Sequence, residues 1–180
     1  AKTAKEIVTK QLAKNIAEIE YLERVLSALE NADDETGLSE IRAELMNEGY
    51  IKKEKGKQKD IISAPHKFSY EGYEIYIGKN NRQNDYVTLK LGRTKDLWLH
   101  AKDIPGSHVI IKSKGEIIPN NVIEKAAELA AFYSRGRNST GVSVDYTEVK
   151  NVHKPSGSAP GKVIYANYRT AHVRHCGKIS

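Results

Sequence analysis

Cysteine, tryptophan and methionine each occur only once in this chain of 180 residues. The single Cys176 excludes an internal disulfide and a zinc site built from cysteines, and it favours a reducing compartment. No run of about 20 apolar residues is present, so no transmembrane helix is expected. The start, AKTAKEIVTK, has neither Met nor a charged-then-apolar signal pattern. These absences indicate a piece of a longer protein from the cytoplasm.

The net charge of +6 is unevenly distributed along the chain. Residues 1–49 carry six Lys/Arg and eleven Asp/Glu, a net charge of −5, whereas residues 50–180 carry 23 and twelve, a net charge of +11. A strongly basic domain is typical of proteins that contact phosphate backbones, although basic solvated surfaces are also common. The two parts therefore have different partners or faces.

An apolar residue recurs at steps of four and three near the N-terminus, with Asn15 filling one place. The positions are Val8, Leu12, Ile19, Leu22, Leu26 and Leu29. This heptad seam predicts a helix, and a second amphipathic stretch over residues 38–45 predicts another. We expect residues 1–51 to form an antiparallel, coiled-coil-like helical hairpin that either packs on the rest or projects as an arm. Residues 52–64 are expected to be a charged linker.

Beyond the linker the apolar period changes to two, which indicates strands. Strands are predicted around 75–77, 87–91, 97–101 and 109–111, in an antiparallel meander with a hairpin loop at 79–85. A helix with a small-residue face is predicted at 119–136, and further strands at 142–149 and 163–173. The expected fold is α+β, a mostly antiparallel sheet with one covering helix behind the helical hairpin, in a domain over 65–174 with a tail at 175–180.

The segment KDLWLHAKDIPGSHVIIK, residues 95–112, holds the only tryptophan and two of the six histidines. If Leu97, Leu99 and Ala101 point into the core, pleating sends alternate side chains to the other face of the sheet. Those side chains are Trp98, His100 and Lys102, an aromatic and basic set that could stack a nucleobase and hold a phosphate. The alternative is that helix 119–136 covers this face and Trp98 is a core aromatic. Pro105 and Gly106 predict a type II turn, after which His108, a further candidate contact for nucleic acid, begins the next strand.

A reaction centre at His100, Asp103 and His108 is a competing hypothesis. Their spacing matches no metal-ligand signature, and no nucleophile motif accompanies them. Structural histidines are therefore favoured, and we expect no enzyme activity, no metal and no cofactor.

The loop KPSGSAPGK superficially resembles a phosphate-binding loop. Gly157 and Gly161 enclose only three residues, and Val163 follows the lysine, so it is not a P-loop. Its basic neighbourhood is still a candidate for nucleic-acid backbone contacts, against the alternative of a solvated loop. The candidates are Lys150, His153, Lys154 and Lys162. Arg135 and Arg137 are further candidates, although cations at a helix end also complement the helix dipole.

Several blocks, in order, resemble the NFACT-R domain of the bacterial RqcH family, which also carries the name fibronectin-binding protein A and has NEMF as its eukaryotic counterpart. The blocks are EGYEIYIGKNNRQNDYVTLKL, DLWLHAKDIPGSHVII, AAELAAFYS, VSVDYTEVKNV and KPSGSAPGKVIY. The match covers about residues 65–170, and LSEIRAELMNEGYIKK resembles the end of the coiled-coil middle region of the family. The tail AHVRHCGKIS departs from the family pattern.

This resemblance implies an RNA-binding module of a ribosome quality control factor. The family binds obstructed large ribosomal subunits carrying peptidyl-tRNA, recruits tRNA and supports template-free alanine addition to the stalled chain. The implied partners are tRNA, rRNA and, through the coiled coil, a ribosomal protein. The acidic-basic pair of the family lies in an N-terminal domain outside this chain, so no catalytic residue is carried over. The alternative is a fibronectin-binding surface adhesin domain, displayed on the cell by an unconventional route.

Overall fold

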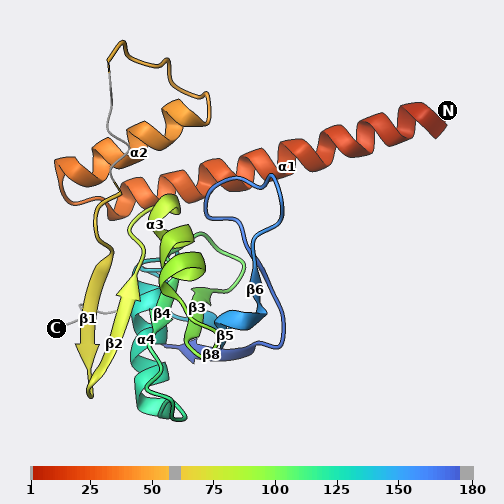
Figure 1. The fold of residues 1–180 in the computed structure, drawn as a ribbon. Helices are drawn as coiled ribbons and strands as arrows, with labels where there is room; N and C mark the ends of the chain where they lie inside the picture. The colour runs from red at the N-terminus through yellow and green to blue at the C-terminus, as the bar shows by residue number, and fades with distance from the viewer. Residues whose placement is uncertain (1, 57–61, 175–180) are drawn as a thin grey trace.

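A computed structural model describes residues 2–56 and 62–174 (Figure 1). Its helices are α1 (Lys2–Asn31), α2 (Glu35–Asn47), α3 (Asn81–Tyr86) and α4 (Asn120–Phe132), with a π-helical turn η1 (Val87–Leu91) and a 3-10 turn η2 (Val149–Asn151). The predicted tail lies outside the described residues. No helix of the described part is long and apolar enough to cross a membrane.

Six strands form one antiparallel sheet in the order β1-β2-β4-β3-β5-β8. They are β1 (His66–Tyr70), β2 (Tyr73–Ile77), β3 (Leu97–Ala101), β4 (Val109–Ile111), β5 (Val142–Glu148) and β8 (Arg169–Val173). A separate two-stranded ribbon pairs β6 (Val152–His153) with β7 (Ile164–Tyr165). The α+β class is confirmed, but the predicted meander is wrong, because β4 lies between β2 and β3.

The expected hairpin loop at 79–85 and strand at 87–91 are both wrong, since these residues form α3 and η1. Asn80 begins the helix by accepting a hydrogen bond on its side chain from the Gln83 main-chain N–H. In a strand, Val87 and Leu89 would lie on the same face. In the structure they do not, because Val87 is fully buried whereas Leu89 is 43% exposed. The asparagines and glutamine, typical of turns, are here buried hydrogen-bond donors.

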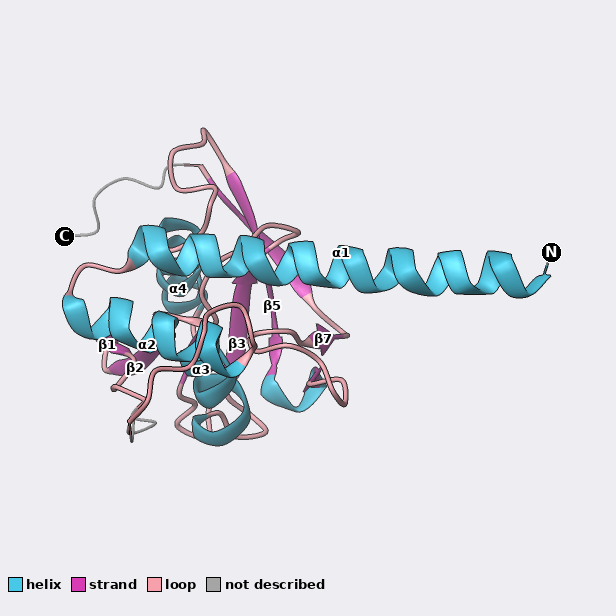
Figure 2. Cartoon of the chain, turned by 90° about the horizontal axis from the view of Figure 1, so that it is seen from above, coloured by secondary structure: helices cyan, strands magenta, loops and turns pink. Residues whose placement is uncertain are grey.

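The main core lies between the sheet and α4, as predicted for a helix with a small-residue face. Leu99 and Ala101 are fully buried there, with Ala126 and Ala130 of α4 against them. The opposite face of the sheet is covered by α3, η1 and the β6–β7 ribbon, where Trp98 packs with Val87, Ile110 and Val152. Seen from above, the sheet lies between α4 and α3 (Figure 2).

Helix α1 is both packed and projecting. Its C-terminal half lies across the top of the domain, while its N-terminal half extends beyond it (Figures 1 and 2). The buried positions are Tyr21, Val25 and Ala28. Most of the predicted heptad seam does not face the domain, because Leu12, Ile19 and Leu26 are 58%, 56% and 49% exposed, and only Leu22 of the seam packs against the buried cluster.

A buried polar network fixes the helical hairpin to the domain. Glu40 Oε2 of α2 accepts from Asn80 Nδ2 at 2.6 Å and from Gln83 Nε2 at 3.0 Å. Glu44 Oε2 accepts from Asn81 Nδ2 at 3.0 Å and from Tyr21 Oη at 2.7 Å. Buried charged groups are tolerated when they are hydrogen bonded in this way.

Candidate nucleic-acid interface

Pleating of β3 sends Trp98 and His100 to the face away from α4, as predicted. The expectation of an exposed stacking platform fails for Trp98, which has no exposed surface. Helix α4, the alternative cover for Trp98, does not lie over it either. Tyr165 of β7 covers Trp98 instead, with the centroids of the two rings 4.7 Å apart. Because Tyr165 covers the Trp98 ring, a ligand could approach Trp98 only from the pocket that it lines.

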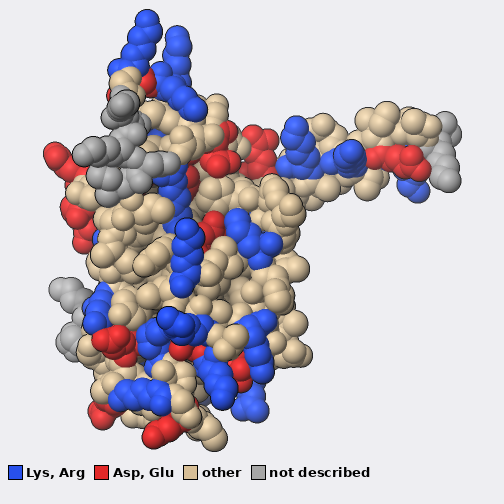
Figure 3. Space-filling view, in the orientation of Figure 1, with Lys and Arg blue, Asp and Glu red and all other residues tan. Residues whose placement is uncertain are grey.

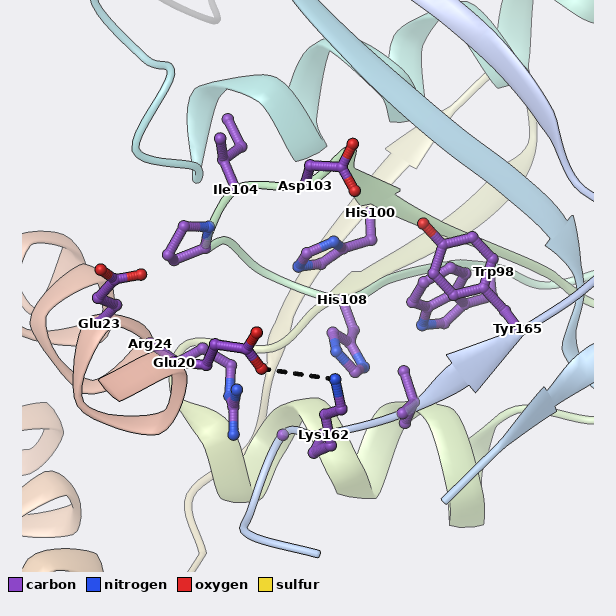
Figure 4. Close-up of a pocket in the computed structure, with 13 residues that line it drawn as sticks. Glu20, Glu23, Arg24, Trp98, His100, Asp103, Ile104, His108, Lys162 and Tyr165 are labelled. Carbon is purple, nitrogen blue, oxygen red and sulfur yellow. Dashed lines mark ion pairs between the residues drawn. The ribbon is translucent and has the colours of Figure 1, made fainter. Parts of the chain in front are cut away.

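A pocket of about 400 Å³ opens beside Trp98, under α1 (Figure 4). Three distant segments line it. Helix α1 supplies Glu20, Glu23 and Arg24; the β3–β4 hairpin supplies Trp98, His100, Asp103, Ile104, Pro105 and His108; and the loop before β7 supplies Gly161, Lys162, Val163 and Tyr165. The pocket is thus built where the coiled-coil helix meets the domain.

The two histidines of this pocket are uncharged at neutral pH. Burial lowers the pKa of His100 to about 4, against hydrogen bonds with the main chain of Gly106 and Ala101 that raise it. Burial also lowers the pKa of His108 well below its ordinary value, and the nearby His100 adds to this effect. His108 Nδ1 is 2.8 Å from Thr88 Oγ1, so a hydrogen bond holds the ring.

A catalytic or metal arrangement at His100, Asp103 and His108 finds no geometric support. In the described residues no hydrogen bond joins Asp103 to either histidine, and no group of three or more His, Cys, Asp or Glu side chains is placed to hold a metal. The two imidazoles instead meet edge to face, with centroids 5.4 Å apart.

The turn between β3 and β4 differs from the predicted type II turn. Such a turn needs positive φ at Gly106, but the residue with positive φ is Asp103, at 57°. Gly106 is required for another reason, since a Cβ there would lie 3.0 Å from Ser134 Cβ. The turn is held against the end of α4 by the Arg135 N–H, which donates to the Pro105 carbonyl at 3.0 Å.

The basic residues predicted to contact nucleic acid around the loop at 154–162 do not line one common surface. Lys154 is turned inward, where its Nζ lies 3.2 Å from Asp85 Oδ2 and donates to the Ala159 carbonyl at 2.8 Å. Lys162 lies at the pocket rim, 3.7 Å from Glu20. Lys150 lies at the far end of the sheet, half exposed and 3.2 Å from Glu148.

Of the other candidate cations, Lys102 and Arg135 line one hollow of about 420 Å³, which none of the remaining candidates lines. Lys102 lies 3.6 Å from the buried Asp145. Arg135 is 3.9 Å from Glu30 of α1, and the Arg137 guanidinium lies 3.8 Å from the centroid of the Phe132 ring. His153 is exposed on β6. These four side chains therefore share no surface with the pocket.

A second hollow lies at the end of the sheet away from α1, and we call it the basic groove. Its volume is about 730 Å³, and its cations are Lys95 before β3, Lys150 after β5 and Arg169 at the start of β8. In the described residues no ion pair joins Lys95 or Arg169 to a carboxylate. Asn151 and Asn167 add amides to the same walls. Figure 3 shows basic side chains over the lower part of the domain, with acidic side chains among them.

Sequence reasoning named only Lys150 of the basic groove and missed Lys95 and Arg169. It also missed Arg24 and Tyr165 of the pocket. The positive charge of residues 50–180 was the available signal, but it does not tell which cations come together.

Comparison with known proteins assigns both parts of the chain. Residues 65–167 match the family model described as the NFACT protein RNA binding domain, and residues 1–62 match the one described as the NFACT N-terminal and middle domains. The match over 65–167 covers more than half of the chain.

Curated relatives agree. The Rqc2 homolog RqcH of Bacillus subtilis is 40% identical over 178 residues, and the RqcH of Streptococcus pneumoniae is 41% identical; each match covers 96% of this chain and 31% of the relative. A coiled-coil domain-containing protein 25 homolog of Dictyostelium discoideum is 32% identical over 60% of this chain and 55% of its own length. The chain thus spans about a third of the length of the RqcH relatives.

A solved structure has the same fold. It is the C-terminal part of the fibronectin/fibrinogen-binding protein from Streptococcus suis, with a TM-score of 0.88, 38% identity, and coverage of 97% of this chain and 70% of that one. The resemblance drawn from the sequence is confirmed, and the chain belongs to the NFACT family, with its RNA-binding domain at residues 65–167.

Proposed function

We propose that this chain is a non-enzymatic RNA-binding module and that it contacts RNA through the basic groove. The observation that carries the proposal is the convergence of Lys95, Lys150 and Arg169 on one hollow at the open end of the sheet. Lys150 pairs with Glu148, and Glu116 also lines the groove, but in the described part of the chain Lys95 and Arg169 form no ion pair. Cations without an ion pair attract phosphates, and counterions are released when nucleic acid binds.

The side chains of the groove are better suited to contacts with the RNA backbone than to recognition of the base sequence. Lysine and arginine reach phosphate oxygens, while the amides of Asn151 and Asn167 can bond phosphate, sugar or base edges. A single-stranded segment or the backbone of tRNA fits these requirements.

For the whole protein we propose a role in ribosome quality control. The support is the relationship to RqcH proteins over almost all of this chain. In this role the protein binds obstructed large ribosomal subunits and tRNA and supports C-terminal alanine tailing of stalled chains in the cytoplasm. The projecting half of α1 is the candidate contact for a ribosomal protein or rRNA.

The test is fluorescence anisotropy of labelled tRNA titrated with the 180-residue chain across a salt series. The variant Lys95→Ala, Lys150→Ala, Arg169→Ala removes three cations of the groove. We expect the variant to bind more weakly, with a slope of log affinity against log salt reduced by about two to three units.

The matched control is Lys52→Ala, Lys53→Ala, Lys55→Ala, which removes the same charge from exposed positions outside both α1 and the groove. Equal loss of affinity in the two triple variants would show that net charge, rather than the groove, determines tRNA binding. In the full-length protein, the groove variant should also reduce co-sedimentation with large ribosomal subunits.

Fibronectin binding is a second candidate, because the neighbouring Streptococcus suis structure is named for it. Electrostatic attraction of a basic domain to fibronectin would be screened at moderate salt. Binding to immobilised fibronectin that persists at about 0.5 M NaCl, well beyond the screening of exposed charges, would favour this function over the groove proposal.

A further inference from the structure

One side of the pocket under α1 is aromatic and uncharged. The rings of Trp98 and His100 are stacked, with centroids 5.8 Å apart and planes 10° from parallel. His108 meets the Trp98 ring edge to face at 5.4 Å. Because burial keeps both imidazoles neutral, this side of the pocket offers aromatic surface without positive charge. Such surface suits a planar heterocycle.

Two hydrogen-bond donors of the pocket are unused. Within the described part of the chain, Trp98 Nε1 and Arg24 Nε are buried and have no hydrogen-bond partner. Trp98 is fully buried, and both residues line the pocket. The indole and guanidinium N–H groups only donate, so a ligand that relieves them must supply acceptors.

The rim carries both signs of charge. Glu20, Glu23 and Asp103 surround the entrance together with Lys162, whose Nζ is 3.7 Å from Glu20 (Figure 4). Three carboxylates disfavour a phosphate inside the pocket, but they accept hydrogen bonds from amino groups. Lys162 is 43% exposed and remains able to meet a phosphate outside.

We propose that this pocket binds one unstacked nucleobase that carries an exocyclic amino group, with the adjacent phosphate outside it near Lys162. The base stacks within the aromatic side of the pocket, its carbonyl or ring nitrogen accepts from the free donors, and its amino group donates to a rim carboxylate. Adenine and cytosine satisfy these requirements, whereas uracil lacks the amino group. The volume of about 400 Å³ is in the range of small-ligand sites. This inference rests on the proposed RNA binding and adds a base-selective site to it.

The test uses Trp98, the only tryptophan, as a reporter inside the pocket. Trp98 fluorescence is recorded while the chain is titrated with hexanucleotides of adenosine, cytidine or uridine, and with an abasic hexamer of equal charge. We expect a saturable change with adenosine and cytidine, at least about fivefold weaker affinity for uridine, and no change with the abasic hexamer. Arg24→Lys keeps the charge but removes the Nε donor geometry, and it should weaken adenosine hexamer binding about tenfold.

A second variant guards against misfolding of Arg24→Lys. Lys162→Ala lies on the rim and should weaken every hexanucleotide equally, leaving the preference among bases unchanged. Labelled tRNA anisotropy in the same buffer separates the two proposals. If tRNA binds but Trp98 responds equally to the abasic hexamer, or to none of the hexamers, the base pocket is wrong and RNA binding stands. If neither tRNA nor any hexamer binds, both proposals fail.

Discussion

The Tyr21 hydroxyl donates a hydrogen bond of 2.7 Å to Glu44 Oε2 in the buried centre of the joint between the helical hairpin and the domain. The same oxygen accepts from Asn81 of α3, so one carboxylate ties three helices together. Burial raises the pKa of Glu44, and these hydrogen bonds oppose that rise. The joint therefore depends on keeping this carboxylate hydrogen bonded.

Tyr21→Phe should destabilise the protein by about 1.5–3 kcal/mol, because it removes a buried hydrogen bond to a desolvated carboxylate. Urea unfolding followed by circular dichroism measures the change. Tyr50→Phe is the control, since its hydroxyl bonds Glu18 at the exposed surface. Equal effects of both substitutions would contradict a special role for the buried bond.

The position at which α1 is anchored can be tested with two apolar substitutions. Val25→Ala removes two buried methyl groups and should cost about 2 kcal/mol, because Val25 is only 4% exposed. Leu12→Ala should leave the free energy of unfolding nearly unchanged, because Leu12 is 58% exposed on the projecting half. A larger loss for Leu12→Ala would place the anchoring face on the heptad seam instead.

Acid should destabilise the domain through His100 and the buried His108. Their pKa values are lowered in the folded state, so the unfolded chain takes up protons first as pH falls below about 6.5. The stability that the neutral histidines contribute is therefore fully present above pH 6.5. It decreases as the pH falls towards about 4, the pKa of His100 in the folded state. His100 contributes up to about 1.4 kcal/mol per pH unit in this window, and His108 changes stability in the same direction.

Urea midpoints between pH 7 and pH 5 measure this dependence. His108→Gln should flatten the pH profile, whereas His153→Gln, at an exposed position, should leave it unchanged. If the unmodified protein and both variants lose stability equally as the pH falls, groups other than His108 dominate acid destabilisation.

Gly78 is expected to tolerate no side chain. A Cβ there would lie 2.8 Å from the Asn84 main-chain nitrogen and 2.1 Å from its Oδ1, which accepts from the His108 N–H. Gly78→Ala should cost about 3 kcal/mol through overpacking. Gly141→Ala is the matched control, since its Cβ would meet only the Val173 carbonyl at 3.6 Å. Thermal unfolding distinguishes the two.

The predictable parts of the fold are those that follow from the regular spacing of apolar residues within a short segment. Leu99 and Ala101 alternate with Trp98 and His100, and the alanines of α4 lie on one stripe, so the β3–α4 contact follows from neighbouring residues. The failure at 79–91 has a tertiary cause. Its amides find Glu40 and Glu44 some 40 positions away in the chain, and no local pattern reveals such partners.

The candidate site was less predictable for the same reason. Trp98 could be assigned to a face of the sheet, but its cover comes from Val87 and Tyr165, which reach it through η1 and a long loop. The basic groove combines Lys95, Lys150 and Arg169 from three strand ends. Which strand ends are adjacent depends on the order of strands in the sheet, and the expected meander did not include the strands predicted at 142–149 and 163–173.

The projecting half of α1 has a mechanical consequence for the pocket. The helix contains neither Gly nor Pro over its 30 residues, so it behaves as a stiff rod, and Glu20, Glu23 and Arg24 on that rod form one wall of the pocket. About 18 residues extend beyond this wall, a lever of about 27 Å. A tilt of about 10° about this wall would move Lys2, the first described residue of α1, by about 5 Å. A force on the N-terminal part of α1 would therefore displace the pocket wall slightly without passing through the sheet.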